Sequence, residues 1–89
     1  MMHVKFAPPA WDDYQFWKAA DTKISAHIDR LIENTRRTPF QGLGKPEPLR
    51  GQLQGLWSRR ITEADRFVYR VSGVSPNQVL EIAQLRYHY

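Results

Sequence analysis

The sequence contains no cysteine and no long apolar run. The absence of cysteine excludes a disulfide framework and any zinc site built on thiolates. No stretch approaches the ~18 apolar residues of a membrane span, and residues 1–9 lack the apolar run of a signal peptide. Because H-E-x-x-H and similar ligand spacings are also absent, we expect no metal site and no cofactor. These absences together favour a cytoplasmic protein that does not bind a membrane.

What the chain has in excess is positive charge. Its 13 Lys and Arg residues against 9 Asp and Glu residues give a net charge of +4. Such a balance is typical of a protein with an anionic partner, either a nucleic acid or an acidic protein, although a basic domain without such a partner has the same composition. With 42% hydrophobic residues, the 89 residues can build one core, so we expect a single domain over residues 1–89.

The spacing of apolar residues predicts an α+β fold. Alternation over residues 2–6 is typical of a half-buried strand, and Pro8 can open a helix after it. Asp21 is a good N-cap for a second helix, which Pro39 ends and whose apolar positions are Ile24, Ile28, Leu31 and Ile32. Three strands follow, over residues 56–61, 66–72 and 78 to about 87, and a short strand is also expected near Leu49. The order β-α-α-β-β-β predicts two helices packed on one face of an antiparallel sheet.

Alternation within these strands places two arginines on the side away from the core. In residues 66–72 the apolar side is formed by alternate residues, so Arg66 points to the opposite side. In residues 56–61, Trp57 and Ile61 are core positions, and Arg60 points away from them. If the helices cover one face of the sheet, Arg60 and Arg66 share the other face and form a basic floor. Two solvated arginines on an exposed sheet would give the same pattern.

A carboxylate and an imidazole complete a set of groups suited to RNA cleavage. Glu47 lies between Pro46 and Pro48, and because each proline restricts its own backbone and that of the residue before it, Glu47 is held stiffly, as in many ordinary loops. His88 is the residue before the last, where fraying is usual, yet it lies between two tyrosines. When the RNA's own 2′-hydroxyl is the nucleophile, the protein needs only a base, an acid and cations. Glu47, His88 and the arginines supply these groups without a metal.

Six stretches of the chain resemble the YoeB toxins, a branch of the RelE/ParE superfamily. They are Trp11-Asp12-Asp13-Tyr14, Thr35-Arg36-Arg37-Thr38-Pro39-Phe40, Gly44-Lys45-Pro46-Glu47-Pro48-Leu49, Trp57-Ser58-Arg59-Arg60-Ile61-Thr62-Glu63, Arg66-Phe67-Val68-Tyr69 and Arg86-Tyr87-His88-Tyr89. The resemblance implies the toxin of a type II toxin–antitoxin system with a microbial-ribonuclease-like, RelE-like fold. It also implies cleavage of mRNA in the ribosomal A site and inhibition by a YefM-type antitoxin.

The same resemblance implies a role for each motif residue. The catalytic set is the base Glu47, the phosphate-binding Arg66, the acid His88 and the terminal Tyr89. The residues that would hold the RNA are Arg60, Arg50 and Lys45. Arg50 stands where relatives more often have lysine, which keeps the charge but changes the hydrogen-bond geometry. The turn over residues 72–78 is also longer than in those relatives.

Two other functions remain open at this point. A ParE-like toxin that acts on a protein target shares the fold but lacks the acid–base residues, so Glu47, His88 and Tyr89 argue against it. A nucleic-acid-binding module without catalysis explains the charge but not the carboxylate of Glu47. The sequence also leaves open the codon preference and whether the chain forms a homodimer.

Overall fold

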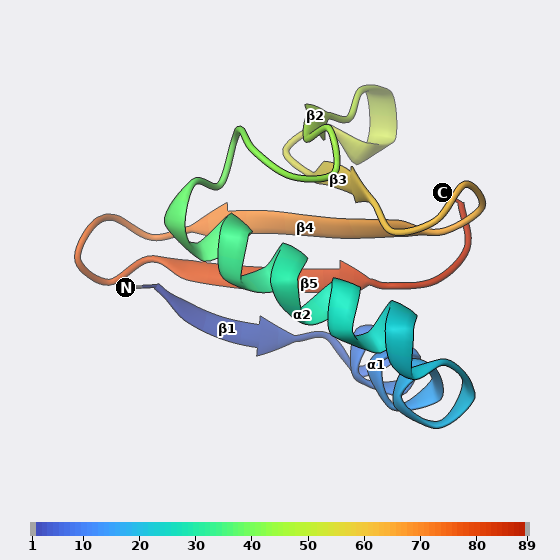
Figure 1. Cartoon of the computed structure of the whole chain (residues 1–89). Helices are drawn as coiled ribbons and strands as arrows, with labels where there is room; N and C mark the ends of the chain where they lie inside the picture. Colours follow the sequence, from blue (N-terminus) through green and yellow to red (C-terminus); the bar gives the residue numbers. More distant parts are fainter. Residues whose placement is uncertain (1, 89) are drawn as a thin grey trace.

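The computed structural model describes residues 2–88, in which two α-helices pack on one face of a five-stranded sheet (Figure 1). The elements in chain order are β1 (His3–Phe6), α1 (Pro8–Ala20), α2 (Thr22–Arg37), β2 (Glu47–Pro48), the 3-10 helix η1 (Gly51–Leu53), β3 (Trp57–Arg60), β4 (Arg66–Ser72) and β5 (Val79–Gln84). The predicted α+β class and its element order are confirmed, and β2 lies beside the expected position near Leu49. Over the described residues, neither helix combines the length and the apolar character that crossing a bilayer requires.

The sheet has the strand order β1-β5-β4-β3-β2 and is mixed rather than wholly antiparallel. The pairs β2–β3, β3–β4 and β4–β5 are antiparallel, as the sequence predicts, but β1 runs parallel to β5, with Val4 opposite Leu80. Alternation over residues 2–6 predicts a strand and says nothing of its direction relative to a partner near the other end of the chain. The expectation of a purely antiparallel sheet is therefore corrected at this one edge.

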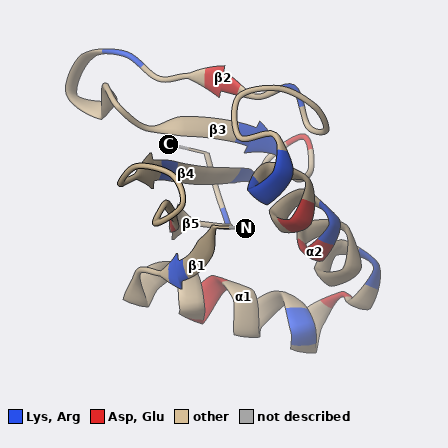
Figure 2. Ribbon diagram, turned by 90° about the vertical axis from the view of Figure 1, so that its left-hand side faces the viewer, with Lys and Arg blue, Asp and Glu red and all other residues tan. Residues whose placement is uncertain are grey.

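Local sequence explains how the helices begin and which face they cover. α1 begins at Pro8 with proline in its first turn, and Asp21 caps α2 by accepting hydrogen bonds from two backbone N–H groups at 3.0 and 3.1 Å. The predicted apolar stripe of α2 faces the sheet, and its residues Ile28 and Leu31 are completely buried in the same core cluster as Phe67 of β4. Neither α-helix covers the opposite face of the sheet (Figure 2).

The last strand ends earlier than the sequence predicts. β5 ends at Gln84 rather than near Tyr87, and a bulge shifts its register with β4, so that Gln84 pairs with Val68 and Ile82 pairs with Tyr69. After β5 the chain turns at Tyr87, whose φ is 67°, and runs toward the turn between β3 and β4 (Figure 1). The backbone beyond Gln84 is hydrogen-bonded to side chains of α1 and of the β3–β4 turn, and the Tyr87 carbonyl accepts from the N–H of Arg66, the first residue of β4.

Candidate active site

Strand register places one carboxylate and two arginines on the uncovered face of the sheet. Paired residues of antiparallel strands project to the same side. Glu47 pairs with Ser58, which pairs with Val68, and the neighbouring row pairs Arg60 with Arg66. Both rows lie on the side opposite the core. The structure thus brings Glu47, Arg60 and Arg66 together on one face.

The backbone around Glu47 is fixed to β3 on both sides. The Arg60 N–H donates to the Gly44 carbonyl at 2.7 Å. The Leu49 N–H donates to the carbonyl of Leu56, just before β3, at 2.9 Å. Gly44 has φ 78°, and a Cβ there would meet side chains of α2 and β3 at 3.0 and 3.1 Å, so only glycine fits this close approach. Lys45 follows with φ 52°, a conformation that residues with a side chain rarely adopt. The exposed carboxylate of Glu47 therefore stands on a rigid support.

Arg59 is an important residue that the sequence reasoning missed. It is completely buried, and its three nitrogens donate five hydrogen bonds. The acceptors are the Tyr69 hydroxyl (3.2 Å), Asn34 Oδ1 (2.7 Å) and the carbonyls of Leu43 (3.0 Å), Thr38 (2.6 Å) and Gln41 (3.1 Å). Arg59 thereby fixes the segment that leads from α2 to the Glu47 loop. Strand alternation could have found it, because Arg59 lies between Trp57 and Ile61 on the core side.

The two arginines of the second row differ in their contacts. Arg60 is exposed, whereas Arg66 is half-buried. Nη1 of Arg66 donates to the carbonyls of Thr62, Glu63 and Asp65 at 2.8, 3.1 and 3.1 Å. This anchoring to the β3–β4 turn uses one of the three guanidinium nitrogens and orients the planar group. A phosphate is recognised best by two adjacent N–H groups in such a fixed plane.

The C-terminal segment that carries His88 is attached to the start of β4. The Arg66 N–H donates to the Tyr87 carbonyl at 3.0 Å, and the Tyr87 N–H donates to Asp65 Oδ1 at 2.7 Å. We call these two hydrogen bonds the C-terminal clasp. Asp65 is held in turn by the Thr62 hydroxyl, which donates to Oδ2 at 2.7 Å. The exposed His88 directly follows Tyr87, whose carbonyl accepts the hydrogen bond from the Arg66 N–H, so the clasp holds His88 near Arg66.

Helix α1 holds the same segment from the other side. The Leu85 N–H donates to Asp13 Oδ2 at 3.0 Å, and the Trp17 Nε1–H donates to the Leu85 carbonyl at 2.8 Å. The Arg86 guanidinium lies 3.5 Å from the centroid of the Phe16 ring, a cation–π contact. Contacts from α1 therefore hold Leu85 and Arg86, the residues that lead to the clasp. The sequence reasoning did not identify Asp13, Trp17 or Asp65 as residues that position this segment.

The other residues singled out by the sequence lie at the margins of this face. Lys45 and Arg50 are exposed on either side of β2, and Arg50 precedes η1. Tyr89 lies outside the described residues. Within residues 2–88, no group of three or more His, Asp or Glu side chains is arranged to hold a metal ion.

Comparison with known proteins identifies the family. The family model described as the YoeB-like toxin of bacterial type II toxin–antitoxin systems matches residues 6–89. The toxin YoeB of Escherichia coli strain K12 is 51% identical over 88 residues, which cover 99% of this chain and 100% of that protein. The toxin RelK of Mycobacterium tuberculosis strain H37Rv is 48% identical over 89 residues, covering 100% of both chains.

Solved structures agree with the sequence matches. A YoeB/ParE toxin from Agrobacterium tumefaciens superposes with a TM-score of 0.94 at 53% identity, covering 99% of this chain and 100% of that one. The toxin in a heterotetrameric YoeB–YefM complex from Staphylococcus aureus gives a TM-score of 0.86 at 36% identity, covering 100% of this chain and 99% of that one. The chain therefore belongs to the YoeB family of toxins of bacterial type II toxin–antitoxin systems.

Proposed function

We propose that this toxin is an endoribonuclease that cleaves mRNA in the ribosomal A site and thereby inhibits translation. The observation that carries the proposal is the shared sheet face of Glu47, Arg60 and Arg66, with the clasp that holds the His88 segment beside Arg66. A surface of this kind offers a base, cations and an acid to one phosphodiester. Because ribosomes are its site of action, we place the protein in the cytoplasm.

Each group has one step in the proposed reaction. The Glu47 carboxylate removes the proton from the 2′-hydroxyl, and the 2′-oxygen forms a bond to the adjacent phosphorus. Arg66 and Arg60 stabilise the negative charge that builds up on the non-bridging oxygens. The bond from phosphorus to the 5′-oxygen of the next nucleotide breaks as the His88 imidazolium protonates that oxygen. The products are a 2′,3′-cyclic phosphate and a 5′-hydroxyl, and the protein groups account for every proton and charge without a metal.

Three more residues complete the proposed site. Lys45 and Arg50 flank β2 and are exposed, so they are suited to hold phosphates on either side of the scissile bond. We assign Tyr89 a catalytic role beside His88, as the resemblance of the terminal Arg86-Tyr87-His88-Tyr89 stretch to the YoeB toxins implies. An Arg at position 50 can bind a phosphate through two N–H groups, where a lysine would act as a point charge.

The proposed protein partner is a YefM-type antitoxin. The Staphylococcus aureus relative forms a heterotetrameric complex with YefM, and a YoeB dimer is also known from that organism. For this chain, an acidic and flexible antitoxin segment would be attracted by the basic face around Arg60 and Arg66. We extend both assemblies, the antitoxin complex and the homodimer, to this protein as proposals.

The decisive experiment maps the cleavage ends on a message bound to ribosomes. Purified wild-type toxin is compared with Glu47→Gln, and Glu33→Gln on α2 serves as the matched control, because the Glu33 carboxylate forms its ion pair with Arg36 on the same helix. Loss of the general base is expected to lower the cleavage rate by ~10²–10³-fold. The control should cleave normally. A folded Glu47→Gln protein with wild-type activity would remove Glu47 from the mechanism.

The nucleophile is tested with modified messages. A 2′-methoxy group at the scissile nucleotide should abolish cleavage of that bond alone, and the natural product should end in a cyclic or 3′-phosphate. A 5′-phosphate on the downstream product would show that water attacks and would refute the 2′-hydroxyl mechanism. If the wild-type toxin stops growth but cuts no message, the non-catalytic ParE-like function is the correct one.

A further inference from the structure

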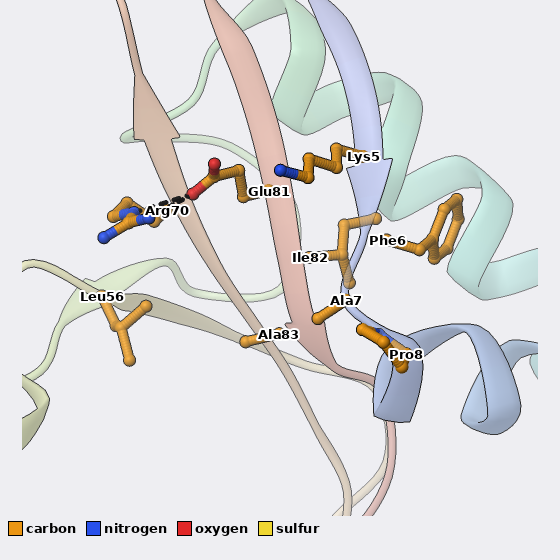
Figure 3. A pocket seen from close by; sticks show the side chains of 9 residues that line it. All are labelled: Lys5, Phe6, Ala7, Pro8, Leu56, Arg70, Glu81, Ile82 and Ala83. Carbon is orange, nitrogen blue, oxygen red and sulfur yellow. Dashed lines mark hydrogen bonds and ion pairs between the residues drawn. The ribbon is translucent and has the colours of Figure 1, made fainter.

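A hollow on the uncovered face of the sheet lies beside the candidate active site. It has a volume of about 470 Å³ and is lined by residues of β1, β4 and β5, by Ala7 and Pro8 after β1, and by Leu56 just before β3 (Figure 3). Leu56 and Arg70 stand on one side of it, Lys5 and Pro8 on the other, and Ala83 lies between them (Figure 3). This volume suits a ligand of nucleotide size.

The strand register relates the hollow to Glu47. Arg70 pairs with Glu81, which pairs with Lys5, so these side chains form a third row on the uncovered face. Arg70 follows Val68 by two positions on β4, and Val68 belongs to the row of Glu47. Two residues along a strand span about 7 Å and two strand spacings about 10 Å, so the Arg70 side of the hollow lies about 12 Å across the sheet from the candidate base on β2. It lies on the side away from the Arg60–Arg66 row.

Of the two cations around the hollow, Arg70 forms an ion pair with Glu81, whereas Lys5 forms none with the described residues. Nε and Nη2 of Arg70 donate to Glu81 Oε2 at 2.9 and 2.5 Å, so the one carboxylate in the lining is engaged by a cation. The Lys5 side chain points across the hollow toward Glu81 from the opposite side (Figure 3). Two cations and one anion leave a net charge of +1 over an otherwise apolar lining that includes Leu56 and Ala83.

We infer that this hollow is a subsite for the RNA nucleotide that flanks the scissile bond, with its base on Leu56 and Ala83 and its phosphate at Lys5. The inference rests on the proposed endoribonuclease function, because such a substrate is a polymer that must continue past Glu47. Beyond the Arg60–Arg66 row the face is bounded by the β3–β4 turn and the C-terminal clasp. The hollow lies at the open end. A nucleotide joins an apolar ring to an anionic phosphate, as this lining requires.

The test couples protein variants to single abasic nucleotides in the message. Ribosome-bound messages that lack one base at each position in turn are cleaved by wild-type toxin and by Leu56→Ala. Loss of an apolar base contact should lower cleavage of the intact message about tenfold. At one flanking position, removal of the base should lower the cleavage rate of wild-type toxin by a similar factor. Leu56→Ala should cleave that abasic message no more slowly than wild-type toxin does, because the protein change and the missing base remove the same contact.

Lys5 provides the second arm of the experiment. Lys5→Gln should raise the ribosome concentration needed for half-maximal cleavage several-fold, Lys5→Arg should restore it, and the matched control Lys23→Gln at the start of α2 should not change it.

Losses that add at every abasic position, or equal behaviour of Lys5→Gln and Lys23→Gln, would overturn the subsite while leaving the proposed function intact. Variants that cleave normally but bind the antitoxin more weakly would assign the hollow to a peptide instead. Wild-type toxin that cuts no message would remove both proposals.

Discussion

Asp65 and Tyr87 connect the turn before β4 to the C-terminal segment, with the Tyr87 N–H donating to Asp65 Oδ1 at 2.7 Å. The next residue completes the connection, since the Arg66 N–H donates to the Tyr87 carbonyl at 3.0 Å. The proposed phosphate-binding residue and the proposed acid, His88, are therefore fixed relative to each other by the same pair of hydrogen bonds. Asp65 is a positioning residue in this arrangement, because it acts through the backbone of Tyr87.

The first prediction follows from the acceptor that Asp65 provides. Asp65→Ala removes it, so the amides of residues 85–88 should exchange with solvent faster and cleavage should fall about tenfold, since a hydrogen bond to a charged group contributes ~1.5–3 kcal/mol. Asp65→Asn keeps an oxygen at Oδ1 and should restore most of both properties. Hydrogen exchange followed by mass spectrometry and the cleavage assay give the two readouts.

The matched control for this prediction is Asp12→Ala, which removes an exposed carboxylate from α1. It should change neither the exchange nor the cleavage. If Asp65→Ala exchanges and cleaves like the wild type, the clasp does not position His88.

The second prediction separates the neighbouring residues Arg59 and Arg60, which lie on opposite sides of β3. Arg59→Lys cannot reproduce five hydrogen bonds to fixed acceptors, so the free energy of unfolding should fall by about 3 kcal/mol. Arg60→Lys changes an exposed side chain. It should leave the unfolding midpoint unchanged and lower cleavage, because a lysine does not form the two-pronged contact with a phosphate.

Urea unfolding and ribosome-dependent cleavage of the two variants should thus give opposite patterns. An Arg59→Lys protein as stable as the wild type would contradict the role of Arg59 in holding the segment between α2 and β2. An Arg60→Lys protein that unfolds early would place Arg60 in the fold rather than in the site.

The contrast between these arginines also shows how far the sequence determines the site. Alternation correctly puts Arg60 and Arg66 on one face, because side-chain direction in a strand depends only on near neighbours. The contacts of the C-terminal segment were not predictable in this way. Asp13 and Trp17 reach Leu85 across 72 and 68 residues of sequence, and no local pattern encodes contacts over such separations. The same limit applies to the parallel pairing of β1 with β5.

The third prediction concerns alkaline pH. Burial raises the pKa of the Tyr69 hydroxyl above its usual value near 10, and the hydrogen bond and charge of Arg59 oppose this only in part. The hydrogen bond from Tyr14 to the Asp29 carboxylate, with burial and the charge of Asp29, likewise raises the pKa of Tyr14. The folded protein therefore keeps these two protons at a pH where the unfolded chain loses them.

The sign of the effect follows from this difference in proton binding. The contribution of both tyrosines to stability should be complete below about pH 10 and should be lost as the pH rises through their raised folded-state pKa values. Urea unfolding between pH 8 and 12 should show this decline, and Tyr14→Phe should make it less steep. A decline of equal steepness in Tyr14→Phe would contradict the contribution of Tyr14.

The fourth prediction concerns association with the proposed antitoxin. An acidic segment approaching the basic face should be steered by long-range attraction, so the association rate constant should fall as ionic strength rises. The apolar part of the interface is less sensitive to salt, so the dissociation rate constant should change much less. Arg60→Gln should slow association, whereas Arg30→Gln, an exposed change on α2, should have a smaller effect. Stopped-flow measurements over a range of KCl concentrations provide the test, and an association rate independent of salt would show that the basic face does not guide the antitoxin.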